Sequence, residues 1–509
     1  MEQIIDYKSK IDFILSNDTS IIQPTQTIVK SKYKKRKCDE CNRRRKPAEK
    51  SPNICHVCYV IKRFNVKQSG NEVIDDFIRN TQIRLVKNAG KMEFVPYDQF
   101  KNIEFIAEGG FSKVYRATWI NGPVIDWNDK CSIRISNYTV VLKKLNNSNN
   151  ITSKELNELK VYYDYSSKFK KNYNTTKNHV CRYFGITKDP NSQNIMIIMP
   201  YYDSGDLIIY ITNCFYDVSW SEKLENLKKI MQGLANIHDV NIIHRDFHSG
   251  NIFFGKDSRF VDDISIGDLG ISKSATESSC NENYGIIPYM APEIFQGQKY
   301  TKATDIYSFG MIMWELMTGR RPFWDRNHDT ELIIEIFDGL RPPIVTNAPK
   351  GYIKLIEECW HSDSEKRPSA TDIYGRIKSM CVDEYNNETN NNPTEIIKSS
   401  DIGPVTKNNP NAIYKSRNIS GMIQSAMSLR SSRSQSINLE QFNYRKNNMI
   451  STGKRKYEND LIEDKNDNGS IKRKKLFENK NNEEIKFDID INFNNNEYIT
   501  VENNFDIDL

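Results

Sequence analysis

The sequence has no apolar run as long as the roughly 18 residues that a membrane-spanning helix requires, and its opening residues, MEQIIDYKSK, contain no hydrophobic signal segment. These absences favour a cytoplasmic protein in a reducing compartment, without a membrane partner. The ten cysteines are therefore not expected to form a disulfide framework. Apolar residues are also scarce, at 38%, which predicts a folded core accompanied by a large disordered fraction.

Composition divides the chain into five regions. Residues 1–29 carry no assignable signal, and residues 30–65 are basic with four cysteines. Residues 66–97 have the apolar spacing of a helical connector, and residues 98–381 have ordinary globular composition. Residues 382–509 are polar and rich in asparagine. That last composition buries too little apolar area to offset chain entropy, so we expect a disordered tail.

The first half of region 98–381 contains a glycine turn and a charged pair. NIEFIAEGGFSKVYRATW predicts strand, tight loop and strand. Glycines let backbone N–H groups approach phosphate oxygens closely, although an ordinary hairpin has the same pattern. TVVLKKL predicts a strand that carries Lys143, and ELNELK places Glu158 on a helical pattern. The two charges would form an ion pair, although each by itself is more simply a solvated charge, and Glu155 is a weaker partner.

The second half contains two groups of oxygen ligands. NIIHRDFHSGNIFF predicts a polar loop between two apolar strands, with Asp246 and Asn251 in the loop. SIGDLGIS places Asp268 in a turn after a short strand. A carboxylate can orient an attacking hydroxyl, and magnesium favours carboxylate and amide oxygens. The sequence therefore predicts a magnesium site at Asn251 and Asp268.

In this order the segments resemble a eukaryotic protein kinase. YMAPEIF, DIYSFGMIMWELMTGRRPF and CWHSDSEKRPS extend the resemblance through residue 381, and the last two are most similar to the tyrosine-kinase-like group of serine/threonine kinases. The resemblance implies an α+β fold with a β-rich N-terminal lobe and a helical C-terminal lobe. It also implies transfer of the γ-phosphate of Mg-ATP to protein substrates in signalling, with serine or threonine as the acceptor.

The resemblance assigns a role to each polar group. Lys143 is expected to contact the α- and β-phosphates, with Glu158 as its partner, and Asp246 to orient the substrate hydroxyl and accept its proton. Glu293 is expected to pair with Arg367, and Asp305 to brace the catalytic loop. The residues expected to contact ATP are Ala107, Gly109, Ser112, Val114, Lys143, Met199 at the gatekeeper position, Pro200 and Tyr202 at the adenine, and Asp206 near the ribose.

The sequence departs from the family pattern at three places. The outer glycines of the loop are replaced by Ala107 and Ser112, a lysine that neutralises the γ-phosphate is replaced by His248, and a threonine that bonds this lysine is replaced by Ile286. Because the main catalytic groups remain, an active kinase is favoured. A catalytically weak pseudokinase scaffold stays open as the alternative.

Regulation by phosphorylation is indicated by an arginine before the catalytic aspartate. Arg245 would bind a phosphate on the activation segment. The acceptors that this segment offers are Ser274, Thr276, Ser278 and Ser279. The simpler interpretation is a polar loop without this function.

The four N-terminal cysteines form two C-x-x-C pairs, Cys38 with Cys41 and Cys55 with Cys58. This spacing is typical of a structural zinc site with four thiolate ligands, and four unrelated cysteines are the alternative. The flanking KSKYKKRK and NRRRK would suit nucleic-acid phosphates or an acidic docking partner. Little aromatic interleaving disfavours nucleic acid, so a zinc-binding nucleic-acid adaptor is the third hypothesis.

Two features of the tail point to partners. KRK at 454–456 and KRKK at 472–475 resemble a bipartite nuclear localisation signal, which would add a nuclear location, although charge runs are common in tails. RNISGMIQSAMSLRSSRSQS at 417–436 mixes arginine, serine and a short apolar face. It is either a partner-docking segment or a kinase substrate, and the sequence does not decide between them.

Overall fold

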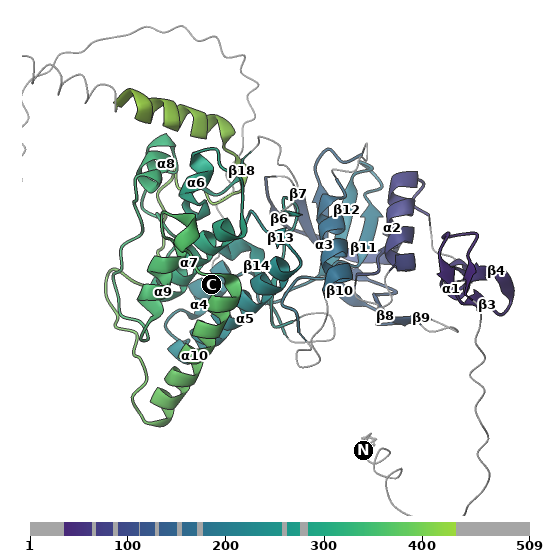
Figure 1. Ribbon diagram of the computed structural model, residues 1–509, viewed down its shortest axis with the longest axis horizontal. Coiled ribbons are helices and arrows are strands. Elements are labelled where there is room, and N and C mark those ends of the chain that lie inside the picture. The colour runs from purple at the N-terminus through teal and green to yellow at the C-terminus, as the bar shows by residue number, and fades with distance from the viewer. Residues whose placement is uncertain are drawn as a thin grey trace, which may run out of the picture. The chain divides into compact units, whose positions relative to one another are not determined.

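The computed structural model (Figure 1) describes most of the chain from residue 35 to residue 433. The described ranges are 35–63, 68–84, 90–110, 112–127, 132–149, 155–169, 177–256, 262–274 and 283–433. Within them, no helix combines the length and the apolar character needed to cross a bilayer.

The N-terminal cysteine region folds into a small unit of short strands and one helix. Its elements are β1 (Arg36–Lys37), β2 (Arg44–Arg45), β3 (Pro47–Ala48), β4 (Ser51–Cys55) and α1 (His56–Arg63). β1 pairs with β2, and β3 pairs with β4, both antiparallel. The unit contacts the next helix, because Arg45 donates a 2.7 Å hydrogen bond to the carbonyl of Ile83 and Glu40 pairs with Arg79.

The predicted connector contains a helix, α2 (Glu72–Arg84), that packs on the following domain. Ile74 and Ile78 are fully buried in its core, and the ring of Phe77 meets Tyr163 edge-on at 6.4 Å. Val73, which the spacing places near them, is instead 44% exposed. The helix therefore links the cysteine unit to the helix that carries Tyr163.

The N-terminal lobe is a six-stranded sheet with the order β5-β11-β12-β10-β7-β6. Neighbouring strands are antiparallel except β5 and β11. One helix, α3 (Asn157–Lys168), belongs to this lobe. The strands are β5 (Glu93–Phe94), β6 (Phe100–Glu108), β7 (Ser112–Trp119), β10 (Tyr138–Leu145), β11 (Gly185–Lys188) and β12 (Ile195–Pro200), with a separate hairpin of β8 (Val124–Trp127) and β9 (Ser132–Arg134).

The C-terminal lobe is helical and is built around α7 (Lys302–Thr318), in which every residue from Thr304 to Thr318 is buried. The remaining helices are α4 (Leu207–Cys214), α5 (Trp220–Asp239), α6 (Pro292–Phe295), α8 (Thr330–Phe337), α9 (Tyr352–Cys359) and α10 (Ala370–Thr389). Short strand pairs carry the loops: β13 (Ile242–Ile243) with β16 (Lys273–Ser274), β14 (Ile252–Phe254) with β15 (Ile264–Ile266), and β17 (Tyr284–Gly285) with β18 (Arg417–Asn418).

The two structural roles predicted in this lobe are present. The Arg367 guanidinium donates to both carboxylate oxygens of Glu293 at 2.7 Å, and both side chains are buried. The carboxylate of Asp305 accepts hydrogen bonds from the backbone N–H groups of His244 and Arg245, both at 2.9 Å. These bonds hold the start of the catalytic loop, so Asp305 braces it as expected.

The C-terminal boundary differs from the prediction. Helix α10 continues to Thr389, and residues 390–433 lie on the C-terminal lobe, ending in a helix over residues 420–433 that Figure 1 shows beside α8. The described part of the predicted tail is held by buried apolar residues, namely Ile402, Ile419, Ile423 and Ala426. Residues 434–509, including both basic clusters, lie outside the described residues.

Candidate active site

A cavity of about 490 Å³ brings together residues from both lobes. The predicted site residues that line it are Gly109, Ser112, Lys143, Glu158, Asp206, Asp246, His248, Asn251 and Asp268. Ala107, Val114, Met199, Pro200 and Tyr202 are not among its lining residues. The residues predicted to contact the phosphates and the metal thus line one cavity. The residues predicted to contact adenine lie outside it.

Lys143 is at the centre of the charged part of the cavity. Its position on β10, in the middle of the sheet, aims the ammonium at α3 and at the turn after β15. Lys143 Nζ lies 3.0 Å from Glu158 Oε2 and 2.8 Å from Asp268 Oδ1. Burial lowers the pKa of Lys143, but the two carboxylates outweigh it and raise the pKa above its usual value. The lysine therefore stays charged, and the predicted Lys143–Glu158 pair is formed.

The two carboxylates differ in their surroundings. Burial raises the pKa of Glu158 although Lys143 and the Tyr183 hydroxyl, 2.8 Å away, act in the other direction. Burial also raises the pKa of Asp268, but there Lys143 outweighs it and the pKa falls below its usual value. Asp268 is thus the more readily ionised group, as a cation ligand should be.

The catalytic loop lies between strands β13 and β14, as its sequence pattern predicts. The side-chain amide of Asn251 donates a 2.9 Å hydrogen bond to the backbone carbonyl of Asp246. This bond uses the amide nitrogen and leaves the amide oxygen as an acceptor. Asn251 and Asp268 both line the cavity and offer oxygen ligands, so the pair suits Mg²⁺.

His248 lies next to Asp246 within this loop. Its Nε2 is 3.7 Å from Asp246 Oδ1, and its Nδ1 accepts a 3.1 Å hydrogen bond from the Gly250 N–H. Burial lowers the pKa of His248, but Asp246 outweighs burial and raises it. The Gly250 bond requires an unprotonated Nδ1, so the ring carries its proton on Nε2, the nitrogen nearer to Asp246.

The glycine loop connects β6 and β7 above the cavity. The Gly109 N–H donates a 2.8 Å hydrogen bond to the Ser112 carbonyl and closes the turn. Gly110 is constrained for another reason, because a Cβ there would lie 2.8 Å from the backbone carbonyl of Ser416. The strand, loop and strand predicted from the sequence are confirmed.

The residues predicted for adenine and ribose follow β12. Met199 and Pro200 end this strand and are buried, and the Tyr202 ring stacks on Phe253 with centroids 5.4 Å apart. The Asp206 carboxylate accepts a 2.9 Å hydrogen bond from the Ile209 N–H and caps α4. Asp206 thus has a structural role in addition to its place in the cavity wall.

Arg245 has a strained backbone, with φ of 72°, and its guanidinium lies over the Tyr300 ring at 4.4 Å. It also donates to the Ile271 carbonyl at 3.3 Å, while its buried Nε has no partner. Of the predicted phosphorylation sites, Ser274 pairs through its backbone with Ile242. Thr276, Ser278 and Ser279 lie outside the described residues.

The structure adds residues to the cavity that sequence reasoning missed. Ser249 and Tyr289 both donate hydrogen bonds to Glu315, whose pKa burial raises to about 7. The cavity wall also contains Arg321 and, from the C-terminal segment, Tyr414, Lys415 and Ser416. No motif marks these three residues, and they come close only through tertiary packing.

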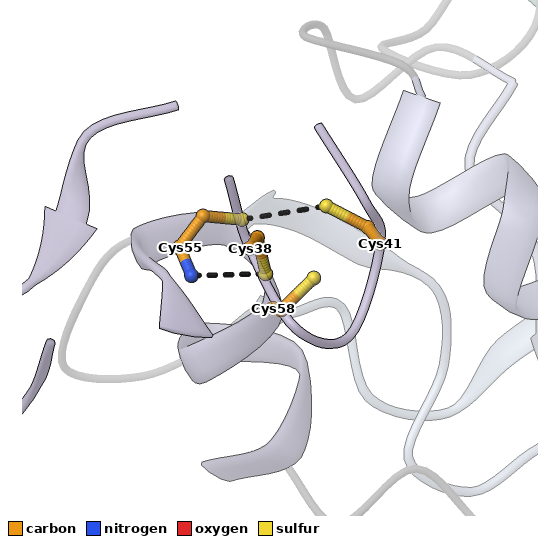
Figure 2. A group of neighbouring side chains, drawn as sticks. All are labelled: Cys38, Cys41, Cys55 and Cys58. Carbon is orange, nitrogen blue, oxygen red and sulfur yellow. Dashed lines mark hydrogen bonds between the residues drawn. The ribbon is translucent and has the colours of Figure 1, made fainter. Parts of the chain in front are cut away.

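The four cysteines of the N-terminal unit form a separate cluster (Figure 2), with all four sulfur atoms within 4.8 Å of one another. The sulfurs of Cys41 and Cys55 are 3.8 Å apart, and the Cys55 N–H donates to the Cys38 sulfur. Burial opposes the Cys38 thiolate, but hydrogen bonds from Cys55 and other backbone N–H groups lower its pKa to about 6. A tetrahedral zinc with ~2.3 Å bonds to sulfur separates its ligand atoms by ~3.8 Å, and the Cys41–Cys55 pair has this spacing.

Comparison with known families decides the identity of the larger domain. A family model described as protein tyrosine and serine/threonine kinase matches residues 100–377, more than half of the chain. The chain belongs to this kinase family. Family membership implies ATP and Mg²⁺ as cofactors and proteins as substrates.

Curated relatives share this kinase region. A protein of Acanthamoeba polyphaga mimivirus, provisionally named a serine/threonine-protein kinase/receptor, is 28% identical over 59% of this chain and 16% of its own length. The stress-activated protein kinase alpha of Dictyostelium discoideum is 27% identical over 58% of this chain and 44% of its own length. The chain thus matches less than half the length of each relative.

Proposed function

We propose that this kinase is catalytically active and transfers the γ-phosphate of Mg-ATP to serine or threonine hydroxyls of protein substrates in signalling. The observation that carries the proposal is Lys143, which bridges Glu158 and Asp268 in the cavity that also contains Asp246. Phosphoryl transfer in kinases requires the lysine–glutamate pair and the metal-binding aspartate to be in place together.

Each residue has a defined task in this proposal. Asp246 orients the substrate hydroxyl and accepts its proton, and Lys143 neutralises the α- and β-phosphates. Asn251 and Asp268 hold Mg²⁺. When bound, the metal ion offsets the charge that develops on the transferred phosphoryl group. Gly109 lets the loop backbone approach the phosphates, and Met199, Pro200 and Tyr202 border the adenine.

The preference for serine or threonine is supported by the C-terminal lobe, whose motifs resemble the tyrosine-kinase-like group, and by the names of the relatives. His248 and Ile286 replace the lysine and threonine that usually interact beside the acceptor. Ile286 is 3% exposed and lines the cavity. We interpret the joint replacement as a change in how the substrate hydroxyl is held rather than as loss of catalytic function. The charged residues expected to contact ATP and magnesium are all retained.

We predict that His248→Ala lowers the rate of phosphate transfer by about 10- to 100-fold, because one hydrogen bond to a charged group contributes about 1.5–3 kcal/mol. His248→Lys should retain most of the activity, since lysine donates from the same place. The measurement is kcat for a peptide substrate at saturating ATP, with the KM for ATP unchanged in both variants. Equal rates for wild type and His248→Ala would contradict a role for this ring.

The cysteine unit and the tail extend the proposal. Cys38, Cys41, Cys55 and Cys58 would hold one structural Zn²⁺, and the basic surface around them would dock acidic partner proteins rather than nucleic acid. We expect a cytoplasmic protein that also enters the nucleus through its two basic clusters. A phosphate on the activation segment would dock at Arg245, whose buried Nε has no partner.

The test is incubation of the purified full chain with Mg-ATP and casein, beside Asp246→Asn. We expect phosphate on casein serine or threonine from the wild type and none from the variant. Phosphoamino-acid analysis identifies the acceptor. No transfer by a wild-type chain that binds ATP would support the scaffold alternative, and phosphotyrosine alone would contradict the proposed specificity.

A further inference from the structure

The C-terminal segment 409–420 passes along the part of the active-site cavity that contains Asp246 and His248. Tyr414, Lys415 and Ser416 line the same hollow as Asp246 and His248. The carbonyl of Ser416 comes so close to the glycine loop that only glycine fits at position 110. A serine of the chain itself therefore lies in the wall of the cavity that contains Asp246.

The segment is held on one side of Ser416 by strand addition. β18 pairs antiparallel with β17 of the activation segment, with Gly285 opposite Arg417 and Tyr284 opposite Asn418. Adding a strand to an exposed edge is a common mode of peptide recognition. Continued by one residue, this register places Ser416 opposite Ile286, and both residues line the cavity.

The next residues lock the strand pair in place. The Ile419 N–H donates a 2.9 Å hydrogen bond to the Asn283 carbonyl, and the Asn283 N–H donates to the Ser420 hydroxyl at 2.8 Å. The Ile419 side chain is completely buried in the core of the lobe. Farther along the chain, Arg433 forms a bidentate ion pair with Glu331 of α8.

On the other side of Ser416 the segment is held by His328 and Tyr414. The His328 N–H donates to the Asn411 carbonyl at 3.0 Å, and its ring meets the Tyr414 ring edge-on at 4.8 Å. The Tyr414 hydroxyl donates to the Pro322 carbonyl at 3.0 Å. Tyr414 is thus an anchor with a committed hydroxyl, and Ser416 lies between two fixed points of the segment.

We propose that residues 409–420 are an intramolecular substrate, and that Ser416 is phosphorylated by the kinase domain of the same chain. The inference rests on the proposed kinase activity and names one acceptor for it. The Ser416 oxygen forms the new bond to the γ-phosphorus of ATP, the bond from that phosphorus to the bridging oxygen breaks, and ADP leaves. The hydroxyl proton passes to Asp246.

The product of this transfer has a consequence for the segment. A phosphoserine carries about 1.5–2 negative charges at neutral pH. At Ser416 it would share the cavity with the carboxylates of Asp246, Asp268 and Glu158. Glu155 and Asp206 also line it, and these five carboxylates outnumber the three lining cations, Lys143, Arg321 and Lys415. Like-charge repulsion therefore disfavours the docked segment. Phosphorylation of Ser416 is therefore expected to release the cavity for external substrates.

The test uses the full chain after phosphatase treatment, incubated with Mg-ATP and casein at enzyme concentrations that span 50-fold. Phosphopeptides are quantified by mass spectrometry. We expect phosphate at Ser416 with a rate per molecule that does not change on dilution. Ser416→Ala should lack this phosphate, and Ser425→Ala, which changes an exposed serine on the following helix, should keep it.

A second variant tests the docking itself. Ile419→Asp removes the buried anchor, so the rate of Ser416 phosphorylation should fall at least tenfold while casein phosphorylation persists or rises. Labelled casein without phosphate at Ser416, or a rate per molecule proportional to concentration, would overturn the inference and leave the proposed function standing. A chain that labels neither casein nor Ser416 would overturn both.

Discussion

Replacing Lys143 by methionine should reduce phosphate transfer by about 100- to 1,000-fold, the cost of removing one preorganised charge donor from a reacting group. The substitution keeps the length of the side chain but removes the ammonium that bridges Glu158 and Asp268. The measurement is kcat/KM for ATP with a saturating peptide substrate.

The same substitution should also destabilise the N-terminal lobe, because it leaves Glu158 buried without its cation. Removing one partner of a buried ion pair costs about 3–5 kcal/mol of folding free energy. The variant Lys143→Met/Glu158→Gln should recover part of this stability in urea unfolding and none of the activity. Such a result would separate the folding role of the pair from its catalytic role.

The matched control is Lys144→Met. Lys144 is adjacent on β10, on the opposite face of the strand, and pairs with Asp189 rather than with the cavity. Its replacement should change kcat/KM by less than about threefold, since neither Lys144 nor Asp189 lines the cavity. Equal losses in the two variants would contradict the special role of Lys143.

Removal of zinc should unfold residues 35–63 and leave the kinase domain folded. Zinc contributes about 10–16 kcal/mol to the folding of zinc-finger peptides. The cysteine unit has only a small apolar cluster to stabilise it without the metal. Its apolar cluster consists of the four cysteines and four aliphatic side chains, namely Ile54, Val57, Ile61 and Ile83 of α2. The purified chain should contain one zinc per molecule by elemental analysis, and a chelator or Cys41→Ser should open the unit to trypsin at Arg43–Lys46.

The control for the zinc prediction is Cys214→Ser, which changes a half-buried free cysteine on α4. It should keep both the metal content and the resistance to trypsin. A wild-type chain that contains no metal and still resists trypsin at Arg43–Lys46 would show that the four cysteines do not form a zinc site.

The main polar groups of the cavity could be predicted because each stands in a short motif whose local structure is encoded nearby. The apolar runs around HRDFHSGN form β13 and β14, and the loop between them places Asp246 and Asn251 together. Lys143 and Asp268 lie 125 residues apart in the chain, yet they form a 2.8 Å bond. This contact was not predicted, since the resemblance paired Lys143 with Glu158 and assigned Asp268 to Mg²⁺.

The C-terminal segment shows where the sequence is insufficient. An asparagine-rich stretch of low average hydropathy favours disorder, and residues 382–433 belong to such a stretch. What matters there is a few isolated apolar side chains, such as Ile402 and Ile419, that fit the surface of the lobe. The average hydropathy of the stretch does not reflect these few residues. It therefore does not predict that the segment packs on the lobe.

The sequence by itself determined which polar groups reach the cavity, the order of strands and loops that carries them, and the two cysteine pairs, because these depend on neighbours within a few residues. Only the tertiary structure decided that Glu315 accepts hydrogen bonds from Ser249 and Tyr289, and that the segment Tyr414–Ser416 lines the cavity. Both arrangements depend on the shape of the folded cavity and on the exposed edge of β17. These surfaces exist only after distant parts of the chain have packed together.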